Sequence, residues 1–152
     1  MILSTLCYIE KDNKYLMLHR VKKKNDVNKD KWIAPGGKFE DKESPEDCVI
    51  REVREETGYI IKEPKLRAVV TFTSKTEETD YMYLFKCTEF EGEPIECNEG
   101  TLEWVDKEKI EELNLWEGDK IFLRKIAQDG PFFTLKLEYD GDKLVNYIIK
   151  EY

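Results

Sequence analysis

Three glutamates stand close together in the segment GGKFEDKESPEDCVIREVREETGY, residues 36–59: Glu52, Glu55 and Glu56. Residues three and four apart share one side of an α-helix, and at about 100° per residue these three fall within about a third of its circumference. Like charges one turn apart repel and weaken a helix slightly. The spacing therefore predicts a site for a positive ion, which would remove the repulsion.

The ligand type indicates which ion. Carboxylate oxygens with no histidine or cysteine among them suit Mg²⁺ or Mn²⁺, and Mg²⁺ usually shares its coordination shell with substrate phosphates. Gly36 and Gly37 let the backbone come close, so a carbonyl there could join the shell. The alternative is a solvated charged face on which Arg51 and Arg54 pair with the glutamates. Spacing alone leaves both readings open.

The helix that must carry these glutamates has clear ends. Ser44 is a suitable N-cap, Pro45 suits the first helical position, and Asp47 completes a capping-box pattern. Gly58 can end the helix in the left-handed conformation. These signals predict a helix over Pro45–Thr57. An apolar stripe beside the glutamates should pack against a sheet: Val49, Ile50 and Val53.

The same residues reproduce the Nudix box, GX5EX7REUXEEXGU, in which U is a bulky aliphatic residue. The matching positions are Gly37, Glu43, Arg51-Glu52-Val53, Glu55-Glu56 and Gly58. One position departs: Tyr59 stands where the last aliphatic residue is expected, and Ile60 follows it. The chain thus resembles the Nudix hydrolases, which implies an α/β fold with a mixed β-sheet sandwiched between α-helices.

The resemblance also implies roles. In this family the box carboxylates bind divalent cations, the box glycine often adds its carbonyl, and the box Glu–Arg pair supports the geometry of the loop and helix. These roles fall on Glu52, Glu55, Glu56, Gly37, Glu43 and Arg51. The family reaction is attack by water on a phosphorus of a nucleoside diphosphate linked to another group. Glu52 or Glu99 is expected to take the proton of that water.

The similarity extends beyond the box, through LMLHR, KWIAPGGK, ECNEGTLEWV, LWEGD and the closing FF…DGDKLVNY. These segments resemble the MutT-like and MutX-type enzymes that hydrolyse 8-oxo-dGTP. The resemblance implies that Glu99 joins the metal site and that Arg20 faces the nucleotide. It also implies that Trp116 and Asp119 stack on and hydrogen-bond a purine. The alternatives are a core role for Trp116, an N-cap role for Asp119 in a helix over 119–128, and a plain surface charge for Arg20.

Two departures weaken the substrate prediction. Ile33 replaces an asparagine that reads the purine in the animal enzymes, and Gly118 replaces one of their two adjacent acids. Fewer polar readers should discriminate bases less sharply. An ordinary dNTP, ADP-ribose or a sugar nucleotide therefore remains an alternative substrate, and a non-catalytic nucleotide-binding module is a third possibility.

The remaining chain supplies strands and helices around this site. Apolar runs predict strands over 3–10, 14–21, 31–35, 66–74, 81–90 and 101–106, with helical pieces over 107–113 and 118–128 and a closing hairpin of 132–139 and 143–152. Strands and helices intermix, as in an α/β fold. We expect a single Nudix domain over 1–152.

The bulk composition excludes several classes. The 152 residues carry a net charge of −8, which argues against a nucleic-acid partner but not against a small phosphorylated substrate with a metal ion. A lone histidine, His19, excludes a His-rich zinc site. Four irregularly spaced cysteines, no leader-like start and no apolar run near ~20 residues predict a cytoplasmic protein with free thiols and no membrane partner. Monomer and homodimer are both compatible.

Overall fold

The computed structural model describes residues 1–152 as one large sheet flanked by helices. The strand order is β11-β10-β6-β7-β1-β2-β3, with β4 beside β1 and β9 beside β2. The strands are β1 (Ile2–Lys11), β2 (Lys14–His19), β3 (Trp32–Ile33), β4 (Gly36–Lys38), β6 (Lys65–Ser74), β7 (Asp80–Cys87), β9 (Thr101–Asp106), β10 (Phe133–Asp140) and β11 (Lys143–Glu151). The sheet is mixed, because β1 pairs with β7 and β6 with β10 in parallel while the other pairs are antiparallel.

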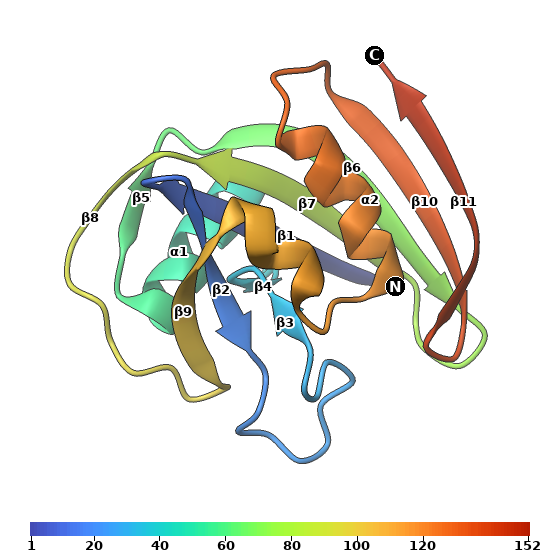
Figure 1. The fold of residues 1–152 in the computed structure, drawn as a ribbon, viewed down its shortest axis with the longest axis horizontal. Coiled ribbons are helices and arrows are strands. Elements are labelled where there is room, and N and C mark those ends of the chain that lie inside the picture. The colour runs from blue at the N-terminus through green and yellow to red at the C-terminus, as the bar shows by residue number, and fades with distance from the viewer.

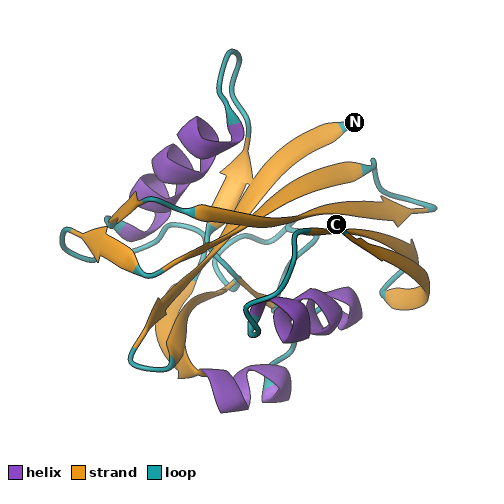
Figure 2. Ribbon diagram, turned by 90° about the horizontal axis from the view of Figure 1, so that it is seen from above, coloured by secondary structure: helices purple, strands orange, loops and turns teal.

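Helices cover both faces of this sheet (Figures 1 and 2). Helix α1 (Pro45–Thr57) lies on one face, whereas the 3₁₀ helix η1 (Lys107–Glu112) and helix α2 (Glu117–Ile126) lie on the other. Each face has its own apolar core, a smaller one under α1 and a larger one under α2. The predicted α/β sandwich is confirmed. No helix combines the length and apolar character that a membrane crossing requires.

Helix α1 has the predicted ends. The Ser44 hydroxyl accepts from the Asp47 N–H at 3.0 Å, and the Asp47 carboxylate accepts from the Ser44 N–H at 3.0 Å. Gly58 ends the helix at φ 83°, in the left-handed region that glycine adopts without strain. Val49 and Val53 are fully buried against the sheet. Caps and apolar packing together fix the direction in which the glutamates of α1 point.

Several predicted elements have different limits. The strand predicted over 81–90 ends at Cys87, and the chain then forms β8 (Glu89–Glu91), which pairs with β5 (Ile60–Lys62) in a separate ribbon. The strand predicted over 14–21 ends at His19. The closing hairpin is confirmed as β10 and β11.

Candidate active site

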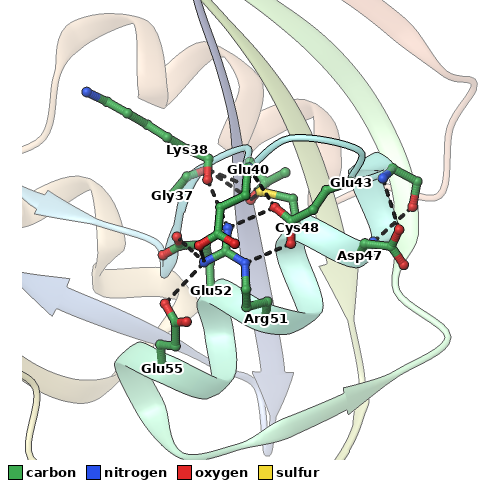
Figure 3. A network of polar contacts seen from close by, with 11 residues as sticks. Gly37, Lys38, Glu40, Glu43, Asp47, Cys48, Arg51, Glu52 and Glu55 are labelled. Atoms are coloured by element: carbon green, nitrogen blue, oxygen red, sulfur yellow. Dashed lines mark hydrogen bonds and ion pairs between the residues drawn. The ribbon is translucent and has the colours of Figure 1, made fainter.

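Arg51 ties the loop before α1 to the helix (Figure 3). Its Nε and Nη2 donate to the two oxygens of Glu43 at 2.7 and 2.9 Å, and Nη2 also donates to the Lys38 carbonyl at 3.0 Å. The hydrogen bond from Arg51, followed by one from the Glu40 N–H, lowers the pKa of Glu43 to about 2. This forked pair gives the loop a defined geometry.

The same guanidinium reaches two of the three clustered glutamates. Arg51 Nη1 donates to Glu52 at 2.7 Å and to Glu55 at 3.2 Å. Arg54 forms no ion pair with any of the three glutamates. The alternative, in which both arginines pair with the glutamates, therefore holds for Arg51 and not for Arg54. Glu55 is half exposed at the rim, with 57% of its side chain accessible.

Glu56 and Glu99 meet in the interior of the site. Glu56 is 8% exposed, and its Oε1 accepts from the Gly36 N–H at 2.7 Å. Its carboxyl also lies close enough to that of Glu99 for each group to shift the pKa of the other. Burial and the contact with Glu99 raise the pKa of Glu56. Two carboxyl groups can share a buried position only when a proton or a cation lies between them.

Glu99 is also held from the other side. Arg20 Nη1 donates to it at 2.7 Å and Lys23 Nζ at 2.8 Å. Burial acts to raise the pKa of Glu99, but the closeness of Glu56, the hydrogen bond from Lys23 and the charge of Arg20 outweigh it and lower the pKa. Arg20 in addition donates to Asp26 at 2.7 Å and is only 13% exposed, so it is not a plain surface charge.

Gly37 is required by the position of Glu52. A Cβ at Gly37 would lie 2.3 Å from Glu52 Oε2. Burial raises the pKa of Glu52, and its hydrogen bond to Arg51 opposes this. The Gly37 carbonyl accepts long hydrogen bonds from the Thr5 hydroxyl at 3.4 Å and the Cys48 thiol at 3.6 Å. It thus lies against the packing between α1 and β1.

The donor set fits a hard divalent cation by its chemistry. In this structure no three carboxylate, imidazole or thiol groups converge as a ready set of ligands, because Glu52 and Glu55 turn toward Arg51. Glu56 and Glu99, however, lie close enough to shift the pKa of one another, and the charge of Glu99 acts on Glu52. Glu52, Glu56 and Glu99 are therefore the residues that would hold such a cation, which would supply the positive charge this group of acids needs. The metal-ligand roles stay predictions.

Trp116 lies in a second region, at the start of α2. It is the N-cap residue of α2 and is 7% exposed. Its Nε1 donates to Asn28 Oδ1 at 2.8 Å, and Phe72 and Tyr139 pack against its ring at steep angles. Lys31 Nζ lies over the same ring, 4.9 Å from its centroid. Trp116 is therefore a core aromatic, and its indole also borders the loop between β2 and β3.

Asp119 is buried beside this ring without a partner. It is 5% exposed, and its carboxylate forms no hydrogen bond within the chain, but its oxygens are not fully enclosed and reach the molecular surface. Burial raises its pKa to about 7, and the charge of Lys31 opposes the rise. The N-cap alternative for Asp119 is wrong, because α2 begins at Glu117 and no side chain caps it.

The structure shows the surroundings of Ile33 and Gly118, the two residues that differ from the animal enzymes. Ile33 packs against the larger core. A Cβ at Gly118 would lie 2.5 Å from Leu137 Cδ1 and 2.8 Å from the Tyr139 oxygen, which accepts from the Gly118 N–H at 2.7 Å. A second acid at position 118 has no space here.

The fold thus brings together Glu52, Glu56, Glu99 and Arg20. Trp116 and Asp119 lie in a separate region at the start of α2. The loop between β2 and β3 contacts both regions. Lys23, in the basic run 22–24 that could attract a triphosphate, donates to Glu99. Sequence reasoning missed three further residues of this mostly polar stretch: Asp26, Asn28 and Lys31.

Comparison with known proteins defines the class. The NUDIX domain model matches residues 2–126, so the chain belongs to the Nudix family and is a Nudix hydrolase. It is 38% identical over 120 residues to the Nudix hydrolase YvcI of Bacillus subtilis, which is 76% of this chain and 72% of that one.

Two further similarities cover most of the chain. An oxidized purine nucleoside triphosphate hydrolase of Danio rerio is 30% identical over 131 residues, covering 85% of this chain and 83% of its own. The crystal structure of a mutator MutT protein from Bacillus halodurans superposes with a TM-score of 0.89 at 29% identity, covering 99% of this chain and 98% of that one. The latter similarity includes the C-terminal hairpin, which lies beyond the span of the family model.

Proposed function

We propose that the chain hydrolyses an oxidised purine nucleoside triphosphate, 8-oxo-dGTP, to the monophosphate and pyrophosphate with Mg²⁺ or Mn²⁺. The observation that carries the proposal is the group formed by Glu52, Glu56 and Glu99, in which Glu56 is only 8% exposed and accepts from the Gly36 N–H. Arg51, Arg20 and Lys23 neutralise part of the negative charge of this group, and a divalent cation would neutralise the rest. The name of the Danio rerio relative, an oxidized purine nucleoside triphosphate hydrolase, supports the substrate.

Four carboxylates and one carbonyl are the proposed ligands of the cation: Glu52, Glu55, Glu56, Glu99 and Gly37. When bound, the ion neutralises charge on phosphate oxygens and acidifies the attacking water. The glutamates of α1 hold their direction through the caps and buried valines of that helix. Arg20, which lies against Glu99, offers a positive charge to the triphosphate.

Hydrogen bonds distinguish the two candidates for the general base, Glu52 and Glu99. Both oxygens of Glu99 accept hydrogen bonds from cationic side chains, Arg20 and Lys23. Glu52 accepts from Arg51 through Oε1 only, which leaves Oε2 beside Gly37 free. We assign Glu52 as the group that takes the proton of the attacking water. The water oxygen bonds to phosphorus, the phosphoanhydride bond breaks, and pyrophosphate leaves.

The purine is placed against Trp116 and Asp119. The indole offers a stacking surface, and the carboxylate offers an acceptor that no group of the chain satisfies. An acceptor that is largely removed from water and has no partner in the chain is unfavourable, and a hydrogen bond from a ligand would offset this. The unpaired state of Asp119 therefore favours a base with donors on its edge.

The test of the metal site is Glu56→Gln, which keeps the shape and removes the charge. We expect kcat/KM for 8-oxo-dGTP to fall at least about 100-fold at saturating Mg²⁺. The matched control is Glu46→Gln, an exposed acid in the first turn of the same helix, and its rate should equal wild type. Equal rates for the two variants would remove the assignment.

A second candidate function is hydrolysis of another nucleotide, favoured by Ile33 and by the filled space at Gly118. Rates for 8-oxo-dGTP, dGTP, dATP and ADP-ribose separate the two functions. The highest kcat/KM for ADP-ribose would replace the first proposal. Binding of all four without turnover under Mg²⁺ and Mn²⁺ would indicate a nucleotide-binding module.

A further inference from the structure

The charge of Lys31 lies over one of the residues that the proposed function gives to the base, Trp116, and acts on the other, Asp119. Lys31 Nζ lies 4.9 Å from the centroid of the Trp116 ring and donates to Asn114 Oδ1 at 3.2 Å. Its charge also acts on the buried carboxylate of Asp119. Lys31 is half-buried, and no motif accounts for it.

The backbone of Lys31 is firmly placed. Its carbonyl accepts from the Arg20 N–H at 2.9 Å, which continues the pairing of β2 with β3 by one residue. Its N–H donates to the Asn28 carbonyl at 2.8 Å, and Asn28 also holds the Trp116 indole. The Cα of Lys31 therefore keeps a fixed position relative to Trp116.

The ammonium group, in contrast, is held loosely. A cation over an aromatic ring contributes about 0.5–1 kcal/mol near the surface. The single hydrogen bond of the ammonium, to Asn114 Oδ1, is solvent-exposed and long at 3.2 Å, so water can replace it. Phe72 and Tyr139 pack against Trp116 from within the chain, and Lys31 covers it from the loop. A base that stacks on Trp116 from the loop side must displace this ammonium, which stays within reach of the base edge.

Lys31 can replace the polar, base-contacting side chain that the animal enzymes have at the position of Ile33. Side chains alternate along a strand, so residues 31 and 33 point to the same side of it. Trp32, between them, points to the other side and stacks on His19 with ring centroids 4.4 Å apart. Lys31 thus supplies a polar group to the side on which Ile33 is apolar.

The chemistry of the pair defines the base. An ammonium group only donates hydrogen bonds, and an ionised carboxylate only accepts them. A 6-oxopurine presents an acceptor at O6 beside donors at N1 and the 2-amino group, whereas adenine presents a donor at its 6-amino group. We infer that Lys31 is a specificity residue that donates to O6 of a 6-oxopurine while Asp119 accepts from its adjacent donors. The inference rests on the proposed placement of the base.

The inference separates two kinds of selectivity. Lys31 distinguishes the 6-oxo from the 6-amino group, because an ammonium cannot accept a hydrogen bond. It does not sense oxidation at C8, since O6 is present in both guanine and 8-oxoguanine. Lys31 should therefore leave the ratio of 8-oxo-dGTP to dGTP hydrolysis unchanged.

The test compares Lys31→Met and Lys31→Arg with wild type on dGTP, dITP and dATP at saturating Mg²⁺. Lys31→Met should lower kcat/KM for dGTP and dITP about 10- to 100-fold, mostly through KM, because one specific contact to a base contributes about 1–3 kcal/mol. The rate for dATP should not fall. Lys31→Arg should restore part of the preference. Lys29→Met, an exposed lysine in the same loop, is the control and should match wild type.

Each contrary outcome has a distinct meaning. An equal loss for dGTP and dATP would overturn the inference, since it would show that Lys31 acts on the triphosphate or on the fold. No loss for any substrate would overturn it as well. If wild type hydrolyses none of the three or 8-oxo-dGTP, the proposed function fails instead. Calorimetric binding of dGMP and dAMP then decides on Lys31, with weaker dGMP binding alone expected for Lys31→Met.

Discussion

The two acidic regions of the molecule differ in how their carboxylates are satisfied. In the cluster on α1, Glu52 contacts Arg51 and Glu56 contacts the Gly36 N–H, while Glu99 contacts Arg20. Asp119 is buried as deeply as Glu56 and has no hydrogen-bond partner in the chain. The cluster thus carries its own counter-charges, whereas the pocket of Asp119 leaves an acceptor open.

This difference indicates that the site at Asp119, rather than the cluster on α1, has an acceptor available for a ligand. A largely buried carboxylate with no partner is unfavourable for folding, and a ligand that donates hydrogen bonds would relieve this. In the cluster, Arg51 already supplies a positive charge to Glu52. The pocket of Asp119 gains a partner only when a ligand with hydrogen-bond donors binds.

The largest expected effect comes from Asp119→Asn. Burial raises the pKa of Asp119 from its ordinary value of 3.8 to about 7, so the folded chain binds this proton more tightly than the unfolded chain. Stability is therefore lost as pH rises from about 4 to about 7, by up to about 4 kcal/mol. The amide should recover about 3 kcal/mol of the free energy of unfolding at pH 8 and much less at pH 4.5.

Urea denaturation at several pH values measures this effect. Glu117→Gln, an exposed acid in the same turn of α2, serves as the control and should change the pH dependence little. If Asp119→Asn is no more stable than wild type at pH 8, the carboxylate has a partner after all and the contrast between the regions fails.

The next effect concerns the cluster and comes from Gly37→Ala. The added methyl would overlap Glu52, 2.3 Å from its Oε2, and must push that side chain from its place. We expect kcat/KM to fall about 100-fold, or about 2.7 kcal/mol, because a misplaced catalytic group loses its alignment. Gly130→Ala, where a methyl meets no atom within 4 Å, should leave the rate unchanged. A loss under twofold for Gly37→Ala would contradict the role of Glu52.

The smallest effect should come from Arg51→Lys. Lysine keeps the charge but loses the fork that holds Glu43 and the Lys38 carbonyl. Loss of a supporting contact of this kind costs about 10-fold in activity or metal affinity. A Mg²⁺ titration of the rate compares it with Arg54→Lys, whose arginine is exposed and pairs with none of the glutamates. Identical titrations would show that the fork is dispensable.

The α1 region could be predicted because its determinants are local. Ser44, Pro45, Asp47 and Gly58 set the ends of the helix through contacts within a few residues, and the structure has those ends. The pairing of Glu43 with Arg51 followed from the family motif and is present. Local hydrogen bonds and helical spacing suffice for such features.

The pocket could be predicted only in part because its determinants are distant in the chain. Resemblance pointed to Trp116 and Asp119, but Lys31 and Asn28 reach them through the pairing of β2 with β3. The strand predicted over 81–90 was too long for a similar reason, since alternation along a chain does not reveal that β8 leaves the main sheet for β5.

The hydrogen bonds between Arg20 and the end of the β2–β3 loop have a consequence for divergence among related chains. The Arg20 N–H donates to the Lys31 carbonyl, and the Asp30 N–H donates to the Arg20 carbonyl, so the two ends of the loop meet as neighbours. In the proposed function, one end of the loop lies toward the phosphates and the other toward the base. These hydrogen bonds fix the interval between the two recognition points, so insertions within 22–29 can alter the loop only where they spare the contacts of Lys23, Asp26 and Asn28.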